Sequence, residues 1–217
     1  MENQDDTRET PLATERLKEV FSRGSVEELC QSYGQWADDY DKDLVDELGY
    51  RAPELVASAA ARHVSETDIP ILDVGCGTGL TGKALLECGD WTLHGLDVSQ
   101  AMLDQANEKT IYDELILADL NGSLAIADDT YAGAISSGTF THGHVKADAL
   151  CEISRILKPG APFAFTVHSE FWDKSRFPET LEQLATAQQL RMVERVERPH
   201  IDKLPDKTSF VCVAVAA

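Results

Sequence analysis

The sequence predicts an α/β fold in which helices cover both faces of a mostly parallel β-sheet. The first observation is an apolar run at 69–74, which suits a buried strand because parallel strands are covered on both faces and need not alternate. The second is the glycine-rich turn at 75–79, after which helical periodicity resumes at Leu80. The third is another strand-like run at 91–98, at the spacing of a β-α-β unit.

The glycine turn predicts a nucleotide site. Gly75, Gly77 and Gly79 lack a Cβ, so the backbone can turn tightly and approach a ligand at the N-terminal end of the next helix. Read from Gly77, the letters satisfy the dinucleotide pattern GxGxxG, which alone is a weak signal. Read from Gly75 they give GxGxG, with an acid, Asp73, in the strand just before. Asp73 is therefore the residue that separates the two interpretations.

Asp73 and the glycines together resemble motif I of the class I S-adenosylmethionine (SAM) methyltransferases, whose usual form is Asp-x-Gly-x-Gly-x-Gly at the end of a strand. The resemblance implies that SAM is the cofactor and that the turn holds its methionine end rather than a pyrophosphate. On that basis the cofactor-binding residues of this segment are Asp73, Gly75, Cys76, Gly77, Thr78 and Gly79.

An acid also ends the second predicted strand, at 91–98. Asp97 lies about twenty residues beyond the glycines, and its two carboxylate oxygens are suitably spaced to accept both ribose hydroxyls of an adenosine. This spacing fits NAD and SAM equally. Ser99 is the expected N-cap of the following helix. Val98 and Met102 are assigned to the cofactor site with Asp97.

The third and fourth predicted strands bring further site residues. The third, at 114–120, ends in Asp119 and Leu120, which the resemblance places around the adenine, with the acid near its exocyclic amine. The fourth follows the acidic lead-in at 128–129, and the resemblance directs its end, Ser136, Ser137 and Gly138, towards the methionine portion.

The loop at 139–144 would border the acceptor pocket in such enzymes. Its histidines, His142 and His144, are the candidate general bases, and His168 after the fifth strand is a further one. A base is needed only if the acceptor must lose a proton, and a loop histidine is often just a polar surface residue.

The remainder of the chain continues the same fold. An amphipathic helix is expected at 145–157, ending at Lys158-Pro159-Gly160, followed by a fifth strand at 162–167. Two more strands are expected at 190–196 and 210–215. The resemblance implies that these close a Rossmann-like three-layer sandwich, with a seven-stranded, mostly parallel sheet whose last strand is antiparallel.

The segment before the glycine turn carries an aromatic stripe. Tyr33, Trp36 and Tyr40 recur at helical spacing, which most often means packing against a core. The stretch from Tyr33 to Pro53 also resembles the Williams–Beuren-region methyltransferase-like proteins, which implies that Tyr33 and Tyr40 approach the cofactor and that Trp36 supports a lid. We expect a disordered tail at 1–10 and one methyltransferase domain at 11–217. Within it, 11–65 forms a helical N-terminal lid segment and 66–217 the SAM-binding core.

Composition restricts the partners. The formal net charge is −19, from 38 acidic and 19 basic residues, which disfavours nucleic acid and favours a small or cationic acceptor, although acidity can equally serve solubility. No apolar run approaches the roughly 20 residues of a membrane-spanning helix. The five cysteines lack zinc-like spacing, so we expect no metal and reduced thiols in the cytoplasm. The sequence does not predict an oligomeric state.

The predicted function is in-line methyl transfer from SAM to an unidentified small-molecule acceptor. The alternative is a non-catalytic protein that binds SAM or S-adenosylhomocysteine, because every cofactor motif would be kept. An NAD-dependent oxidoreductase fits less well, since the chain lacks a Tyr-x-x-x-Lys pair.

Overall fold

A computed structural model describes residues 12–21, 25–65, 69–141 and 145–217. The predicted tail at 1–10 and the candidate bases His142 and His144 lie outside these residues. The helices are α1 (Leu12–Phe21), α2 (Val26–Asp41), the π-helix η1 (Lys42–Leu48), α3 (Ala52–Ala61), α4 (Leu80–Leu86), α5 (Gln100–Glu108), α6 (Ala149–Ile156), α7 (Ser169–Trp172) and α8 (Phe177–Thr186). The strands are β1 (Ile71–Val74), β2 (Leu93–Asp97), β3 (Glu114–Leu117), β4 (Gly133–Phe140), β5 (Pro162–His168), β6 (Leu190–Pro199) and β7 (Thr208–Ala216).

The strands form one seven-stranded sheet in the order β3-β2-β1-β4-β5-β7-β6. Neighbours among β1 to β5 are parallel, whereas β7 is antiparallel to both β5 and β6. This arrangement confirms the predicted fold, including the terminal antiparallel pair. Because the order reverses at β1, the carboxyl ends of β1, β2 and β4 meet where ligands bind in open α/β sheets.

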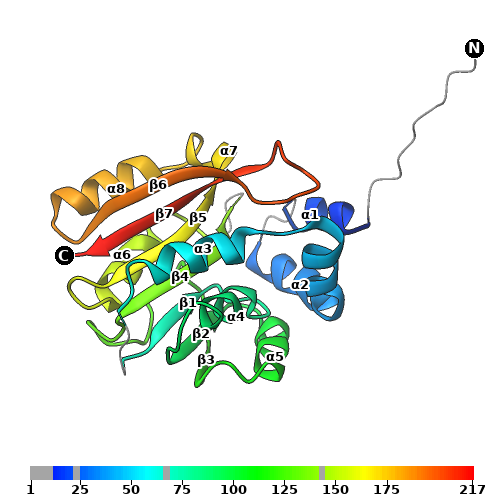
Figure 1. Ribbon diagram of the computed structural model, residues 1–217, viewed down its shortest axis with the longest axis horizontal. Coiled ribbons are helices and arrows are strands. Elements are labelled where there is room, and N and C mark those ends of the chain that lie inside the picture. Colours follow the sequence, from blue (N-terminus) through cyan, green and yellow to red (C-terminus); the bar gives the residue numbers. More distant parts are fainter. Residues whose placement is uncertain (1–11, 22–24, 66–68, 142–144) are drawn as a thin grey trace, which may run out of the picture.

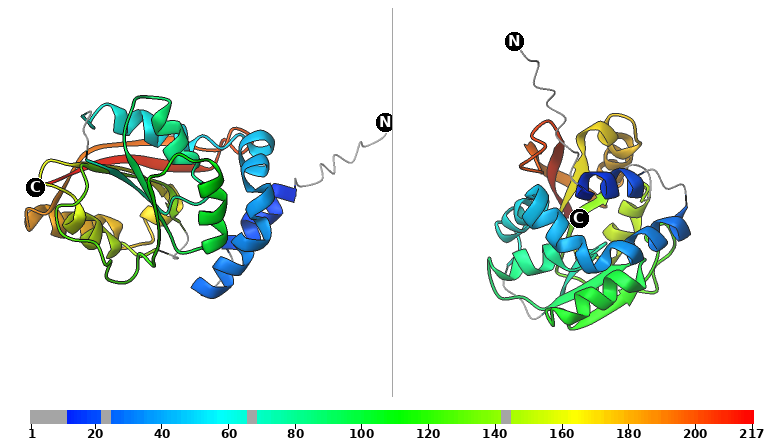
Figure 2. Two further views of the ribbon diagram at one scale, coloured as in Figure 1. Left: turned by 90° about the horizontal axis from the view of Figure 1, so that it is seen from below. Right: turned by 90° about the vertical axis from the view of Figure 1, so that its right-hand side faces the viewer.

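Alternation along the buried strands divides the core between the two faces of the sheet. Ile71 packs in a cluster with α3 and α4, whereas Leu72 and Val74 pack in another cluster with α6 and α8. Asp73 therefore points to the same face as Ile71, towards α4. Figures 1 and 2 show the resulting three layers, with helices above and below the twisted sheet.

The N-terminal helices α1, α2 and η1 form a third cluster, which includes Val20, Leu29, Trp36 and Leu48. They lie at one end of the sheet, where α2 packs against α5 (Figures 1 and 2). This position confirms that a helical segment covers the ligand-binding end of the sheet. None of the helices in the described ranges is long and apolar enough to cross a membrane.

Two predicted boundaries were wrong near the site. Strand β4 continues through Phe140, which the sequence placed in a loop, because the Phe140 side chain is fully buried against the rings of Phe163, Phe165 and Phe177. Helix α6 begins at Ala149 rather than near Val145, and Val145 instead faces a pocket.

Candidate active site

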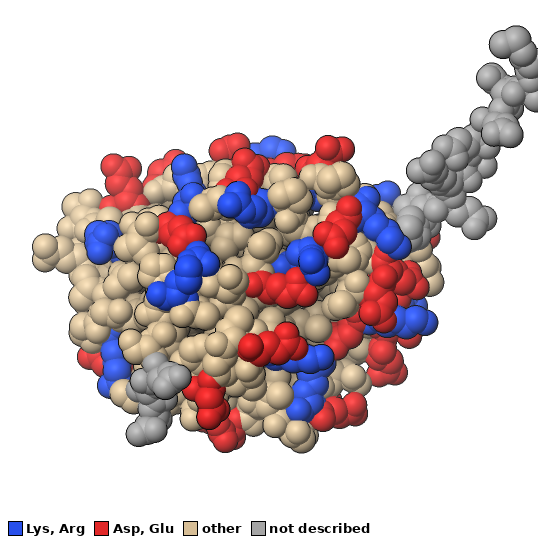
Figure 3. Space-filling view, viewed as in Figure 1, with Lys and Arg blue, Asp and Glu red and all other residues tan. Residues whose placement is uncertain are grey.

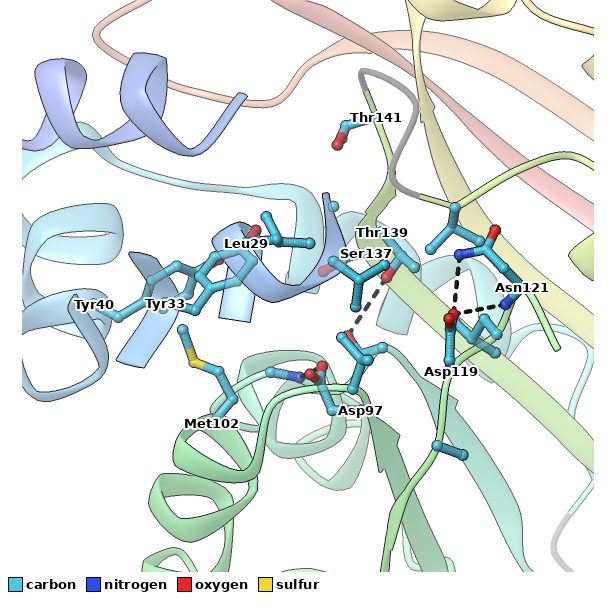
Figure 4. A pocket seen from close by; sticks show the side chains of 18 residues that line it. Leu29, Tyr33, Tyr40, Asp97, Met102, Asp119, Asn121, Ser137, Thr139 and Thr141 are labelled. Carbon is cyan, nitrogen blue, oxygen red and sulfur yellow. Dashed lines mark hydrogen bonds between the residues drawn. The ribbon is translucent and has the colours of Figure 1, made fainter. Parts of the chain in front are cut away.

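A pocket opens at the carboxyl ends of β1, β2 and β4, beside α2 (Figure 4). Its lining combines carboxylates, glycines, hydroxyls and apolar side chains from all these elements. The lining residues are Val26, Leu29, Tyr33, Tyr40, Gly75, Gly77, Asp97, Val98, Met102, Ala118, Asp119, Leu120, Asn121, Ser137, Gly138, Thr139, Thr141 and Val145.

The glycine turn gives this pocket an open floor. Gly75, Gly77 and Gly79 all have positive φ angles, of 66°, 54° and 93°, which favour glycine. A Cβ added to Gly75 would collide with the Thr139 side chain, whereas one added to Gly77 would meet nothing within 4 Å. The backbone at Gly77 therefore borders empty space that a ligand can fill.

Asp97 is held in place by the backbone on both sides. Its Oδ2 accepts the Gly77 N–H at 2.9 Å, and its Oδ1 accepts the Ser99 N–H at 2.9 Å. Burial raises the pKa of Asp97, and these backbone hydrogen bonds oppose the rise. Each carboxylate oxygen can accept more than one hydrogen bond, so both remain able to receive ligand hydroxyls.

Asp119 and Leu120, which follow β3, line the pocket. Figure 4 shows Asp119 on the side opposite Tyr33 and Tyr40. The Asp119 Oδ1 accepts hydrogen bonds from the backbone N and the side-chain Nδ2 of Asn121, at 2.8 and 2.9 Å. Leu120 is buried, and with Val98 and Met102 it supplies apolar surface for a flat ring. This combination of an oriented acid and apolar walls fits a purine nucleoside.

Asp73 lies beneath the turn instead of in the pocket. It is fully buried, and its Oδ2 accepts the Gly82 N–H at 2.9 Å and the Tyr112 hydroxyl at 2.6 Å. Burial raises the pKa of Asp73 to about 7, although both hydrogen bonds act to lower it. Asp73 thus fixes the start of α4 relative to β1.

Asp41, at the end of α2, connects the N-terminal helices to the glycine turn. Its Oδ1 accepts a hydrogen bond from the Thr78 hydroxyl, and its Oδ2 lies 2.7 Å from Lys109 Nζ. Lys109 Nζ also donates to the Thr78 carbonyl oxygen at 2.6 Å. The three side chains close one network across α2, the turn and the end of α5. Thr78 therefore reaches α2 and not the pocket.

The aromatic residues of α2 have two different roles. Trp36 is buried, and its Nε1 donates to Asp43 Oδ2 at 2.8 Å, while Arg16 Nη1 lies 2.6 Å from the same oxygen. Tyr33 and Tyr40 line the pocket with ring centroids 6.0 Å apart, and burial raises both of their pKa values, so both phenols are neutral. Trp36 thus supports the helix that positions the two tyrosines.

Most predicted cofactor residues line the pocket. These are Tyr33, Tyr40, Gly75, Gly77, Asp97, Val98, Met102, Asp119, Leu120, Ser137 and Gly138. Trp36, Asp73, Cys76, Thr78, Gly79 and Ser136 lie outside its lining. Ser136, for example, is buried and donates to the Val74 carbonyl oxygen at 2.7 Å. Sequence reasoning missed Leu29 and Asn121, which carry no motif, and it placed Thr139 and Thr141 beside the acceptor pocket and not in the cofactor site.

A second cavity, of about 380 Å³, adjoins the first. The two share Tyr33, Tyr40, Gly138 and Thr141. The other lining residues are Thr14, Leu17, Lys18, Leu44, Tyr50, Thr166, His168, His200, Ile201, Leu204, Lys207 and Ser209. His168 is the last residue of β5, one position inside the strand it was expected to follow, whereas His200 comes from the connection between β6 and β7 and was not predicted. Within the described ranges, no group of three His, Cys, Asp or Glu residues could hold a metal ion.

The comparisons with known proteins agree with this geometry. The family model described as a methyltransferase domain matches residues 71–160. Methyltransferase-like protein 27 of Homo sapiens is 31% identical over 183 residues, covering 82% of this chain and 74% of that protein. An 18S rRNA (guanine-N(7))-methyltransferase of Arabidopsis thaliana is 38% identical over 91 residues, which cover 41% of this chain and 29% of that enzyme.

A solved TehB-like SAM-dependent methyltransferase from Corynebacterium glutamicum has the same fold, with a TM-score of 0.62 at 18% identity, covering 86% of this chain and all (100%) of that one. The fold, the pocket and these relatives together define a SAM-dependent methyltransferase. The chain belongs to the class I SAM methyltransferase family, and within it the chain is similar to the methyltransferase-like group. The cofactor is SAM, and the open floor at Gly77, the oriented Asp97 and the apolar walls fit it.

The buried carboxyl of Asp73 makes folding stability depend on pH. An ordinary aspartate ionises near 3.8, whereas Asp73 keeps its proton until about 7 in the folded chain. The folded state thus binds more protons between these values, so its stability falls as pH rises. In urea unfolding without ligand, we expect the free energy of unfolding of wild type to fall by about 2 kcal/mol between pH 5 and pH 7, relative to that of Asp73→Asn. A stability difference that is equal at both pH values would contradict this.

The Asp41 network should strengthen cofactor binding. Asp41→Asn removes the ion pair between α2 and Lys109, so the position of α2 over the pocket should be less stable. We expect SAM affinity in calorimetry to fall about twofold to fivefold, because partly exposed ion pairs contribute little. Asp46→Asn makes the same charge change on the exposed side of η1 and is the matched control. Equal losses in both variants would show a general charge effect instead.

Proposed function

We propose that this chain transfers the methyl group of SAM to a small molecule held in the second cavity. The observation that carries the proposal is that the two cavities meet at Tyr33, Tyr40, Gly138 and Thr141. A cofactor in the first cavity and an acceptor in the second would be neighbours across this junction. The reduced state of all five cysteines is compatible with the cytoplasm, which we propose as its location.

The residues that hold the cofactor follow from their positions. We assign the ribose hydroxyls to Asp97 and the adenine to Asp119 and Leu120. The methionine portion is assigned to the glycine turn and to Ser137 and Gly138, which line the pocket beside it on the neighbouring strand β4. Asp73, Cys76, Thr78, Gly79 and Ser136 act indirectly, because each shapes the backbone that lines the site.

The chemistry asks little of the protein beyond alignment. SAM supplies, when bound, an activated methyl group that is transferred to a nucleophile in line with its sulfur. The chain must orient the acceptor and exclude water, and the neutral, half-buried rings of Tyr33 and Tyr40 would do so at the junction. Where an acceptor must lose a proton, the described candidate bases are His168 and His200 in the second cavity.

Nucleic acid is a poorer acceptor than a small molecule. The similarity to the plant rRNA methyltransferase extends over only 41% of this chain. Phosphate backbones need a continuous basic surface, but the net charge is −19. On the face in Figure 3, acidic and basic side chains alternate without a basic patch.

The assignment of Asp97 can be tested by substitution. Asp97→Ala should weaken SAM binding in calorimetry by about 1–3 kcal/mol, because the ribose loses two charge-assisted acceptors. Asp113→Ala removes an exposed carboxylate at the opposite, amino end of the parallel strands and should leave the affinity unchanged. If Asp97→Ala binds SAM like wild type, Asp97 does not contact the ribose.

The proposed activity can be tested without knowing the acceptor. Wild-type protein is incubated with methyl-labelled SAM and, separately, with a small-molecule cell extract or with total cellular RNA. We expect label in the small-molecule extract and none in RNA. Label confined to RNA would overturn the proposal, and SAM binding without any labelled product would favour a non-catalytic binder.

A further inference from the structure

The polar lining of the second cavity is entirely cationic or neutral. Among its described lining residues, the titratable groups other than tyrosines are Lys18, Lys207, His168 and His200, and none is an acid. This is unusual in a chain with twice as many acidic as basic residues, 38 against 19. The first cavity differs, since Asp97 and Asp119 line it. Charge is therefore separated between the two cavities.

The basic groups come from three separate parts of the chain. Lys18 lies on α1, His168 ends β5, and His200 and Lys207 flank the connection between β6 and β7. The connection is tied to the N-terminal half by the bridge between Tyr50 and Ile201. Glu170 lies 3.1 Å from Lys207 Nζ but does not line the cavity. An anion inside would therefore meet two lysines and no carboxylate among the described lining residues, although it would share Lys207 with Glu170.

The two histidines indicate the same preference. Their ring centroids are 5.4 Å apart, both side chains are buried, and His200 Nδ1 lies 3.2 Å from the Ser209 hydroxyl. The pKa of His200 is lowered to about 4, first by burial and then by the neighbouring His168 and Lys207. Repulsion from these two neighbours would also disfavour a cationic acceptor, whereas burial disfavours charge of either sign.

The rest of the wall is apolar. Leu17, Leu44, Ile201 and Leu204 line the cavity together with the rings of Tyr33, Tyr40 and Tyr50. Binding a hydrocarbon or aromatic group against such a wall is favourable, because apolar surface is removed from water. A ligand that matches both the basic groups and the apolar lining of the second cavity has an apolar body and one negatively charged group.

We propose that the methyl acceptor is a small organic acid with an apolar body, whose anionic group is held by Lys18 and Lys207. The inference rests on the proposed function and specifies the substrate class of the same site. It also revises the expectation of a cationic acceptor, which came from the net charge alone.

The first experiment separates acceptors by charge. A small-molecule cell extract is passed over an anion-exchange resin at pH 7, and the retained and unretained fractions are each incubated with wild-type protein and methyl-labelled SAM. We expect the label in the retained, acidic fraction. Label only in the unretained fraction would overturn the organic acid while leaving methyl transfer to a small molecule intact. No label in either fraction, with SAM binding intact, would overturn the proposed function itself.

The second experiment tests the lysines. Lys18→Gln and Lys207→Gln should each reduce labelling of the retained fraction at limiting concentration about tenfold, with unchanged SAM affinity in calorimetry. Lys203→Gln is the matched control, because Lys203 is exposed on the same β6–β7 connection and does not line the cavity. Its labelling should equal that of wild type. Wild-type labelling by both Lys18→Gln and Lys207→Gln would also overturn the proposal.

Discussion

The glycine turn between β1 and α4 is fixed by hydrogen bonds to three carboxylates, and the site depends on this arrangement. Asp73 holds the Gly82 N–H from beneath the turn, Asp97 holds the Gly77 N–H from the neighbouring strand, and Asp41 accepts from the Thr78 hydroxyl on the side of α2. Glycines at alternate positions with positive φ angles can adopt many backbone conformations, so the surroundings must select this one. The three acids therefore set the floor of the pocket and connect it to the sheet and to the N-terminal helices.

This arrangement places buried carboxyl groups where a cationic cofactor binds. Asp97 and Asp73 are both buried enough that their pKa values are raised, so their ionised forms are disfavoured in the ligand-free protein. A positively charged ligand beside Asp97 would offset that cost. Affinity and specificity for SAM then have a common origin in the electrostatics of one strand end.

The parts predicted from the sequence are those whose determinants are local. Strand β1, its glycine turn and Asp97 lie within one β-α-β unit, so spacing alone places them. The second cavity has no such signature, because α1, Tyr50 and the β6–β7 connection meet only through tertiary packing. The orientation of Asp73 is intermediate. Alternation along β1 puts it on the face of Ile71. Its hydrogen bonds from the Gly82 N–H and the Tyr112 hydroxyl, however, form only when α4 and the segment before β3 are packed against β1.

Net charge is a poor guide to what such a cavity accepts. The value of −19 averages over the whole chain, whereas an acceptor interacts over a few ångströms with the side chains that enclose it. The first cavity follows the overall acidity, and the second reverses it with two lysines and two buried histidines. A cationic cofactor and an anionic acceptor would then attract one another across Gly138 and Tyr33, where the cavities join. Opposite charges on the two sides of the junction would favour each reactant in its own cavity.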